Sequence, residues 1–428
     1  MTDLYAYATL SPEPAESFDL HWLDDNSGAD GSNHRIEYRE KDSGDDWIEI
    51  QDISGQEMTA SDGIYLYHVN IDGLNSNTEY GVRIYDEDDE YIEEEFETFP
   101  RRLHKRELFG ISTQDCHIRR SMTGAWEDDK EKMDIISGEN PEFVILPGDW
   151  LTNADDEDSD SADDFRDWIV NWLSRLDNNG KLVPVFYVPG NHETGNGDWT
   201  GTKDEDLSDN EQCNDFCLNK DLFEPDGEYY GQIKIGNYLN IIGLDTHSAY
   251  TEDQGKWLKD NIEKDIPINL IMYHNPIFVS GDRFDSNFDQ GEVQAKYWMS
   301  PIYDAENIWA GFSGNIHVRK VTNPLKVSDD ASGDSFETDD GRYVVEADDG
   351  ERAFIEFGEG WTADKDTVDD WYVDRTESGE EHYYRIWIRN DGHEVEDVAL
   401  NADNEKFEFP VKKTRFQKNK ALLAIGGI

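Results

Sequence analysis

Short apolar runs recur along the middle of the chain, and each of them stops abruptly at a polar cluster. Five such runs, each four to six residues long, cover residues 108–111, 143–146, 183–188, 270–273 and 308–312. Runs of this length between polar or turn-forming residues are typical of strands buried on both faces. The apolar residues of segment 165–176 instead follow helical spacing and give one apolar face. This part of the chain is therefore predicted to be α/β, with the helix packed on the sheet.

The first hundred residues have a different pattern, in which apolar and polar positions alternate. The alternation covers residues 18–22, 67–71 and 80–84, with a turn-forming sequence at residues 73–77. Short alternating segments separated by turns predict an antiparallel β-sandwich. We expect Trp22 to lie in the core of this sandwich.

The end of the chain is also predicted to be rich in strands, with β-like runs at residues 343–345, 354–357 and 383–388. The expected organisation is a β-sandwich domain at 1–100, an α/β domain at 101–325, and a β-rich region at 326–428. This last region either completes the α/β domain or forms a small third domain.

A residue able to bind a metal ion follows each of the five apolar runs. These residues are Asp115 and His117, Asp149, Asn191, His274, and Asn315 and His317. Carboxylate, amide and imidazole groups are ligands of borderline and hard divalent cations. Because open α/β sheets keep their sites at the carboxyl ends of their strands, we expect these side chains to converge.

The order of these motifs resembles that of the calcineurin-like metallophosphoesterases, which include the purple acid phosphatases. The order is Asp-x-His, Gly-Asp, Gly-Asn-His-Glu, a lone His and Gly-x-x-His, and residues 229–231, 241–246 and 254–258 are similar to the family's middle section. The resemblance covers about half the chain and implies a four-layer α/β/β/α sandwich. The N-terminal domain resembles a fibronectin type III module, with Tyr80 at its corner, as found before the catalytic domain in plant-type purple acid phosphatases.

The resemblance also implies two divalent metal ions, of Mn, Fe or Zn. The ligands of the two ions would form three groups: Asp115, His117 and His317 at the first ion, Asn191 and His274 at the second, and Asp149 bridging both.

Two positions depart from the family pattern. Asn315 stands where the family usually has a histidine that binds the second ion. Because an amide oxygen is a weaker donor than imidazole, we expect a looser second site or a harder ion such as Mn. Thr152 replaces the tyrosine ligand of the purple members, so a tyrosinate-to-iron charge-transfer band is not expected.

The activity implied by the resemblance is hydrolysis of phosphomonoesters, or of diesters, by in-line attack of a metal-bridging hydroxide. His192 would not bind metal but would stabilise developing charge or protonate the leaving alkoxide.

Arg119 and Arg120 lie near the first motif and are weaker candidates for contacting the substrate phosphate, with pairing to surface acids as an equal alternative. The basic run at 101–106 is favoured as a linker whose cations pair with neighbouring carboxylates, over a substrate funnel.

A second function from a different class is also compatible with the sequence. Asn315 and the docking-type N-terminal module fit a phosphoesterase-like body used for binding or assembly, for example in the virion of a halophile's virus. A protein partner would then bind through the N-terminal sandwich or the basic C-terminal tail.

The charge of the chain is extreme and evenly spread. The 97 acidic residues against 38 Lys and Arg give a formal net charge of -59, while aromatic residues make up 12%. The aromatic content favours a folded core over disorder. We therefore interpret the acidity as adaptation to molar salt, in a halophile cytoplasm or in a virion or extracellular setting.

Several classes of partner and compartment are disfavoured by the composition. Double-stranded nucleic acid is not expected as a partner, because no basic face is available to neutralise backbone phosphates. No signal peptide and no membrane span are expected from the apolar runs. The three cysteines, Cys116, Cys213 and Cys217, are too few to form a disulfide framework.

The halophilic interpretation predicts that the fold depends on salt. In 1 M salt the Debye length is ~3 Å, so the repulsion between surface carboxylates is screened. Transfer from molar KCl to dilute buffer should remove this screening, and the repulsion should then unfold the protein. Circular dichroism measures this directly, and an unchanged spectrum and melting temperature in dilute buffer would contradict the interpretation.

Overall fold

The computed structural model describes residues 4–25, 34–57, 65–103, 106–113, 125–150, 166–191, 230–246, 251–280, 284–331, 333–358, 367, 370–377, 382–399 and 404–410.

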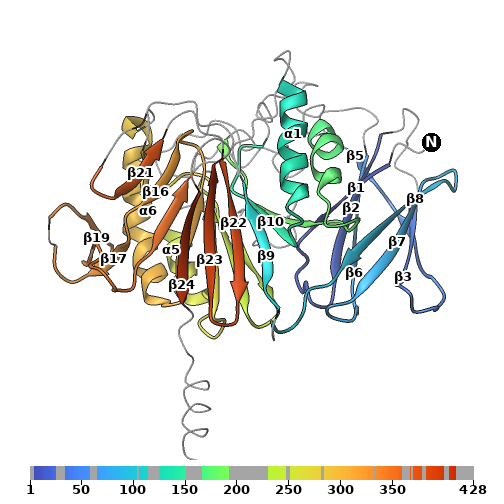
Figure 1. Cartoon of the computed structure of the whole chain (residues 1–428), viewed down its shortest axis with the longest axis horizontal. Helices are drawn as coiled ribbons and strands as arrows, with labels where there is room; N and C mark the ends of the chain where they lie inside the picture. The colour runs from blue at the N-terminus through green and yellow to red at the C-terminus, as the bar shows by residue number, and fades with distance from the viewer. Residues whose placement is uncertain are drawn as a thin grey trace, which may run out of the picture.

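Two large sheets form the centre of the described structure (Figure 1). The ten-stranded sheet has the spatial order β24 (Glu405–Pro410), β23 (Gly392–Ala399), β22 (His382–Arg389), β9 (Leu108–Ser112), β10 (Phe143–Leu146), β11 (Pro184–Tyr187), β1 (Leu4–Thr9), β2 (Phe18–Asp24), β6 (Tyr65–Ile71) and β5 (Gln56–Glu57). The seven-stranded sheet has the order β12 (Gly231–Ile235), β13 (Leu239–Leu244), β14 (Ile268–Tyr273), β15 (Ile308–Ser313), β20 (Ile355–Gly358), β16 (Arg319–Thr322) and β21 (Val373–Glu377).

Two smaller sheets and a few helices complete the described elements. A four-stranded sheet has the order β4 (Ile48–Ile53), β3 (His34–Glu40), β7 (Glu79–Tyr85) and β8 (Tyr91–Glu97), and a three-stranded sheet has the order β17 (Leu325–Ser328), β19 (Tyr343–Glu346) and β18 (Phe336–Glu337). The helices are α1 (Ala125–Gly138), a helical segment at 166–171 followed by the 3₁₀ turn η1 (Leu173–Arg175), α5 (Thr251–Asn261) and α6 (Phe284–Asp304).

The five strands predicted from apolar runs are confirmed as β9, β10, β11, β14 and β15. Neighbouring strands among them run parallel, with β9–β10–β11 in one sheet and β14–β15 in the other. Every residue of β10, β11 and β14 is buried, which explains why these strands show continuous apolar runs and no alternation. The predicted helix at 165–176 is confirmed by the helical segment at 166–171 and η1.

Three apolar clusters hold the sheets and helices together. One cluster contains residues from both large sheets, among them Phe186 of β11 and Phe312 of β15. A second joins the other side of the ten-stranded sheet to α1 and the 166–176 segment, and it includes the fully buried Trp168. The third packs α5 and α6 on the seven-stranded sheet. The predicted α/β organisation, with mixed sheets, few helices and a β-rich N-terminus, is thus confirmed.

The N-terminal strands form a core of their own around Trp22, which is fully buried. Strands β2, β6 and β7 coincide with the alternating runs of the sequence. The Tyr80 hydroxyl accepts a hydrogen bond from the Asn75 N–H at 2.8 Å, which fixes the chain where it enters β7.

Some of the N-terminal strands belong to the ten-stranded sheet. Strand β1 pairs in parallel with β11, in register Ala8 with Pro184 and Thr9 with Val185. At the other side of the same sheet, β22 pairs antiparallel with β9 and continues into β23 and β24. Backbone hydrogen bonds therefore cross both positions at which domain boundaries are predicted. The boundaries at residues 100 and 325 stay predictions.

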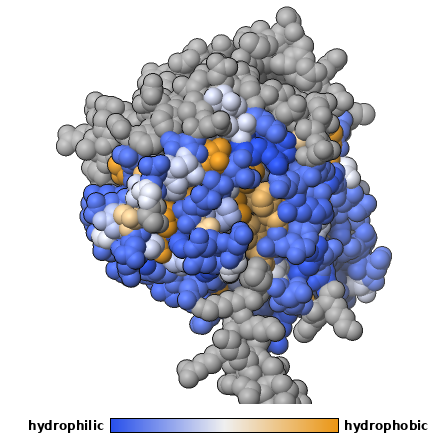
Figure 2. Space-filling view, turned by 60° about the vertical axis from the view of Figure 1, so that its left-hand side comes forward, coloured by the Kyte–Doolittle hydropathy of each residue, from blue (hydrophilic) through white to orange (hydrophobic). Residues whose placement is uncertain are grey.

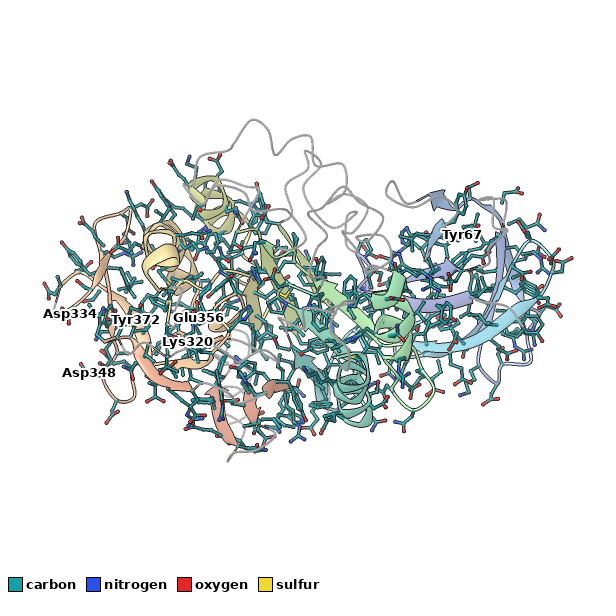
Figure 3. All side chains as sticks on the ribbon, turned by 90° about the horizontal axis from the view of Figure 1, so that it is seen from above. Tyr67, Lys320, Asp334, Asp348, Glu356 and Tyr372 are labelled. Carbon is teal, nitrogen blue, oxygen red and sulfur yellow. The ribbon has the colours of Figure 1, made fainter. Side chains whose placement is uncertain are left out.

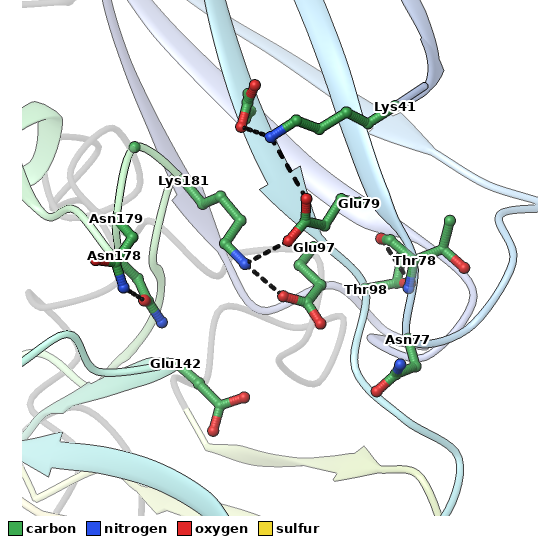
Figure 4. A network of polar contacts seen from close by, with 12 residues as sticks. Lys41, Asn77, Thr78, Glu79, Glu97, Thr98, Glu142, Asn178, Asn179 and Lys181 are labelled. Carbon is green, nitrogen blue, oxygen red and sulfur yellow. Dashed lines mark hydrogen bonds and ion pairs between the residues drawn. The ribbon is translucent and has the colours of Figure 1, made fainter. Parts of the chain in front are cut away.

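Ion pairs reinforce the junction between the N-terminal strands and the rest of the structure (Figure 4). Lys181 lies in the hairpin before β11, and its Nζ donates to Glu79 Oε1 at 3.0 Å and to Glu97 Oε2 at 2.6 Å. The next residue, Leu182, donates its N–H to the Glu95 carbonyl at 2.8 Å and packs in the N-terminal core. One short hairpin therefore joins the two parts through backbone, charge and apolar contacts.

The face of the described structure seen in Figure 2 is mainly hydrophilic, with a narrow apolar strip near the middle of the view. None of the helices in the described segments is long and apolar enough to cross a membrane.

The junction also contains a glutamate whose protonation should affect stability. Burial, and secondarily the Asp177 carboxylate, raises the pKa of Glu94 to about 7. Since the ordinary value is ~4.3, the folded state binds this proton more tightly than the unfolded state, and the stabilisation it provides is lost as the pH rises from ~4.3 through 7. Glu94→Gln keeps the group neutral and should raise the free energy of unfolding at pH 8, by on the order of 1 kcal/mol, but not at pH 4.5.

Denaturant unfolding of this variant at both pH values, in molar salt, checks the prediction. Glu49→Gln, which changes an exposed glutamate of the same four-stranded sheet, is the control. An equal effect of Glu94→Gln at both pH values would contradict the expectation.

Candidate functional site

The carboxyl ends of strands from both large sheets meet at the candidate site. Asp149 follows β10 and Asn191 follows β11, and the Val188 N–H donates to the Leu146 carbonyl at 3.1 Å where these two strands end. His274 follows β14 in the other sheet, where its carbonyl accepts from the Gly314 N–H at 2.7 Å just after β15. The backbone therefore brings four of the five predicted strand ends to one edge.

Side chains from the two sheets are in contact at this edge. The Nε2 atom of His274 lies 3.1 Å from Asp149 Oδ2 and 3.3 Å from Asn191 Oδ1. His274 and Asp149 are completely buried, and Asn191 is 5% exposed. Three of the residues predicted from the sequence therefore lie in contact with one another.

The proton on His274 can be assigned from its other ring nitrogen. Nδ1 lies 2.8 Å from the Pro147 carbonyl oxygen, which can only accept, so Nδ1 carries the proton and donates. In the neutral form of the ring, which is the form that binds a metal, Nε2 presents its lone pair to two oxygens that also carry lone pairs. Such an arrangement is favourable when a cation lies among the three atoms, and an anchored N–H of this kind is typical of metal-binding histidines.

The spacing of the three atoms also fits a metal ion. Two donor atoms that each lie ~2.1 Å from one ion are about 3.0–3.4 Å apart at octahedral to tetrahedral angles. The observed separations of 3.1 and 3.3 Å agree with this geometry. Asp149, Asn191 and His274 therefore fit the divalent ion that the resemblance implies.

Two glycines make the close approach of these groups sterically feasible. A Cβ atom on Gly190 would lie 2.1 Å from Asp149 Oδ1 and 2.5 Å from the Asp149 backbone nitrogen. A Cβ atom on Gly148 would lie 2.6 Å from His274 Nδ1, and its φ of +91° is also unfavourable for other residues. These residues of the Pro-Gly-Asp and Pro-Gly-Asn motifs are thus required by the packing of the site.

Three predicted ligands adopt backbone conformations that are uncommon for residues other than glycine. The φ angles are +54° for Asp149, +71° for Asn315 and +54° for His317. Asp and Asn adopt the left-handed conformation more readily than most residues other than glycine, and at functional sites such conformations are frequently found.

The segment that carries Asn315 and His317 lies beside the segment that follows His274. Both residues are buried, with exposed fractions of 0% and 4%. Ile316 and Val318 pack with Val279, which holds the two segments together.

The structure leaves several predicted residues untested. Asp115, His117, His192, Arg119 and Arg120 lie outside the described residues, as do Thr152 and the three cysteines. Within the described segments, groups of three or more His, Cys, Asp or Glu that could hold a metal are absent. The contact of Asp149 with His274 involves two such residues, and its third donor is the amide of Asn191.

Two arginines of the basic run 101–106, Arg101 and Arg106, form ion pairs. Arg101 pairs with Glu16 at 2.7 Å, and Arg106 pairs with Glu97 at 3.3 Å and with Glu142. These contacts agree with the prediction that this run is a linker whose cations pair with carboxylates.

Sequence reasoning missed a layer of buried polar residues behind the site. Asn275 donates through Nδ2 to Gln290 Oε1 at 2.7 Å and through its N–H to Thr246 Oγ1 at 3.2 Å. Glu356 accepts from the Tyr273 hydroxyl at 2.6 Å. Burial and the Glu356 carboxylate raise the pKa of Tyr273 well above its usual value, so this hydroxyl stays protonated as a donor. The one signal for this layer in the sequence was the position of Asn275, which directly follows His274.

Residues 115–297 match the family model of the calcineurin-like phosphoesterases. The matched segment is less than half of the chain, includes Asp149, Asn191 and His274, and ends before Asn315 and His317. No curated protein matches the chain.

The close approach of Gly190 to Asp149 predicts a selective defect. Gly190→Ala would force Asp149 away from His274, so Mn²⁺ affinity should fall by at least about tenfold while the far-UV circular dichroism is kept. Gly138→Ala at the end of α1 is the control, because a Cβ there meets no atom within 4 Å. Isothermal titration with Mn²⁺ in molar KCl measures the effect, and wild-type affinity in Gly190→Ala would contradict it.

Proposed function

We propose that this chain is a metal-dependent phosphoesterase that hydrolyses phosphomonoesters or phosphodiesters. The observation that carries the proposal is the approach of His274 Nε2 to both Asp149 and Asn191, from two different sheets. The phosphoesterase domain at residues 115–297, whose family is associated with metal-dependent phosphoester hydrolysis, supports the same conclusion.

We further propose that the chain holds two divalent ions. Asp149 would bridge them, with Asn191 and His274 at one ion and Asp115, His117 and His317 at the other. Asn315, which stands where the family usually has a histidine, would complete the coordination of the ion at His274. When bound, the ions would supply Lewis acidity for the activation of water and neutralise charge on the phosphate.

The residues of the chain would perform separate tasks around these ions. Pro147 orients the His274 ring through its carbonyl, so that Nε2 is kept as a lone-pair donor. His192 would donate a proton to the leaving oxygen, a role typically worth ~10²–10⁴-fold in rate. Metal binding would also overcome the repulsion of an anionic substrate by a chain of net charge -59.

The finer structural assignment is part of this proposal. We infer a four-layer α/β/β/α catalytic sandwich of the purple acid phosphatase-like type, preceded by a fibronectin III-like module and completed by the C-terminal strands. The Tyr80–Asn75 hydrogen bond supports the module, and the pairing of β22 with β9 supports a C-terminal region that completes the catalytic domain. This domain layout is the one observation that favours phosphomonoesters over phosphodiesters as substrates.

Two substitutions separate metal binding from proton transfer. Asp149→Ala removes the shared ligand, so it should abolish both metal binding and hydrolysis of p-nitrophenyl phosphate. His192→Ala should keep the metal and lower kcat by ~10²-fold or more. Metal analysis and turnover in high salt with Mn²⁺ measure both effects. A wild-type protein with neither metal nor turnover would exclude the phosphoesterase and favour a binding or assembly role.

A further inference from the structure

A buried ion pair lies in the same sheet as β14, the strand that precedes His274, and is separated from β14 by β15. Lys320 of β16 and Glu356 of β20 are both 0% exposed, and the Lys320 Nζ contacts Glu356 Oε1. Figure 3 shows Lys320, Glu356 and Tyr372 close together, far from Tyr67 of the N-terminal core. Lys320 and Glu356 lie outside the segment that matches the phosphoesterase family.

Glu356 binds both ends of the segment that follows β14. Its Oε2 accepts from the Tyr273 hydroxyl at 2.6 Å and from the Ile277 N–H at 2.9 Å. Its Oε1 accepts from the Phe278 N–H at 3.3 Å. Because His274 lies between Tyr273 and Ile277, one carboxylate fixes the chain on both sides of the proposed metal ligand.

Two cooperating groups hold the same segment through its carbonyls. Lys320 Nζ donates to the Phe278 carbonyl at 2.6 Å, and the Tyr372 hydroxyl donates to the Val279 carbonyl at 2.6 Å. The N–H of Glu356 itself donates to Thr322 Oγ1 at 2.9 Å, which ties β20 to β16. The backbone of residues 277–279 is therefore held to these strands and not only to its own neighbours.

Stability alone is a weak explanation for this ion pair. Desolvation of a buried ion pair generally offsets its attraction, and an apolar pair of similar volume is often as stable. An apolar pair, however, would leave the buried N–H groups of Ile277 and Phe278 without their acceptor. The carboxylate of Glu356 thus supplies the acceptors that the backbone N–H groups of Ile277 and Phe278 need.

We propose that the Glu356–Lys320 pair is a clamp that positions His274 against Asp149 and so sets the affinity for the ion at His274. This role rests on the proposed function. Glu356 and Lys320 are positioning residues and do not bind the metal. The clamp holds the segment after His274, while the Pro147 carbonyl holds its ring, so the imidazole is constrained from both sheets.

Matched variants distinguish a clamp from a merely stabilising ion pair. Glu356→Gln and Lys320→Met both break the pair, but only Glu356→Gln replaces a carboxylate oxygen by an NH₂ group that faces other donors. Asp397→Asn is the control, since it changes a fully buried carboxylate that pairs with the buried Arg319 at 2.9 Å.

The experiment combines two measurements on the full chain in molar KCl. Hydrogen–deuterium exchange of the metal-free protein reports on the backbone N–H groups of residues 274–280 other than Pro276, which has none. Isothermal titration with Mn²⁺ reports on the affinity and stoichiometry of the sites. We expect Glu356→Gln to raise exchange in this segment selectively and to weaken one Mn²⁺ site by roughly 10–100-fold, with smaller effects in Lys320→Met and none on that site in Asp397→Asn.

Each alternative result has a defined meaning. Equal exchange and equal Mn²⁺ affinity in Glu356→Gln and Asp397→Asn would overturn the clamp. Raised exchange in Glu356→Gln with unchanged Mn²⁺ affinity would overturn its role in positioning His274. A wild-type protein that binds no Mn²⁺ would overturn the proposed function and the positioning role together, and the exchange data would then report on the loop contact alone.

Discussion

The arrangement of the site depends on one contact, in which the Asp149 carboxylate of one sheet faces the Nε2 atom of His274 of the other at 3.1 Å. Both groups are completely buried, and a buried carboxylate is costly unless it is paired or coordinated. The Pro147 carbonyl holds one proton of His274 on Nδ1, so in the neutral ring the two facing atoms both present lone pairs. The contact is therefore compatible with a cation, and the buried surroundings strengthen the attraction of such a site for one.

The rest of the fold keeps these two groups in place from both sides. The ten-stranded sheet carries Asp149 and Asn191, and the seven-stranded sheet carries His274. Apolar residues between the sheets fix their separation, while Gly148 and Gly190 leave the space into which the side chains fit. Because packed interiors change little in volume, a displacement of either sheet would be transmitted directly to the site. The N-terminal strands extend the first sheet and add to the rigidity of this frame.

Much of this arrangement could be predicted from the sequence, because buried parallel strands appear as continuous apolar runs and their carboxyl ends carry the polar residues. Asp149, Asn191 and His274 were predictable for that reason. The pairing of β1 with β11 was not, since the choice of a strand partner depends on contacts distant in sequence. Lys320 and Glu356 were missed as well, because a charged residue within a short strand looks exposed until its partner strand is known. The tight packing of Gly190 against Asp149 likewise appears only in three dimensions.

The central claim is that a divalent cation binds among Asp149, Asn191 and His274. Anomalous diffraction from crystals grown in molar salt with Mn²⁺ locates such an ion without reference to activity. We predict an anomalous peak at about 2.0–2.3 Å from both His274 Nε2 and the Asp149 carboxylate. A fully occupied Mn²⁺ elsewhere in the crystal, with no peak beside His274, would contradict this account.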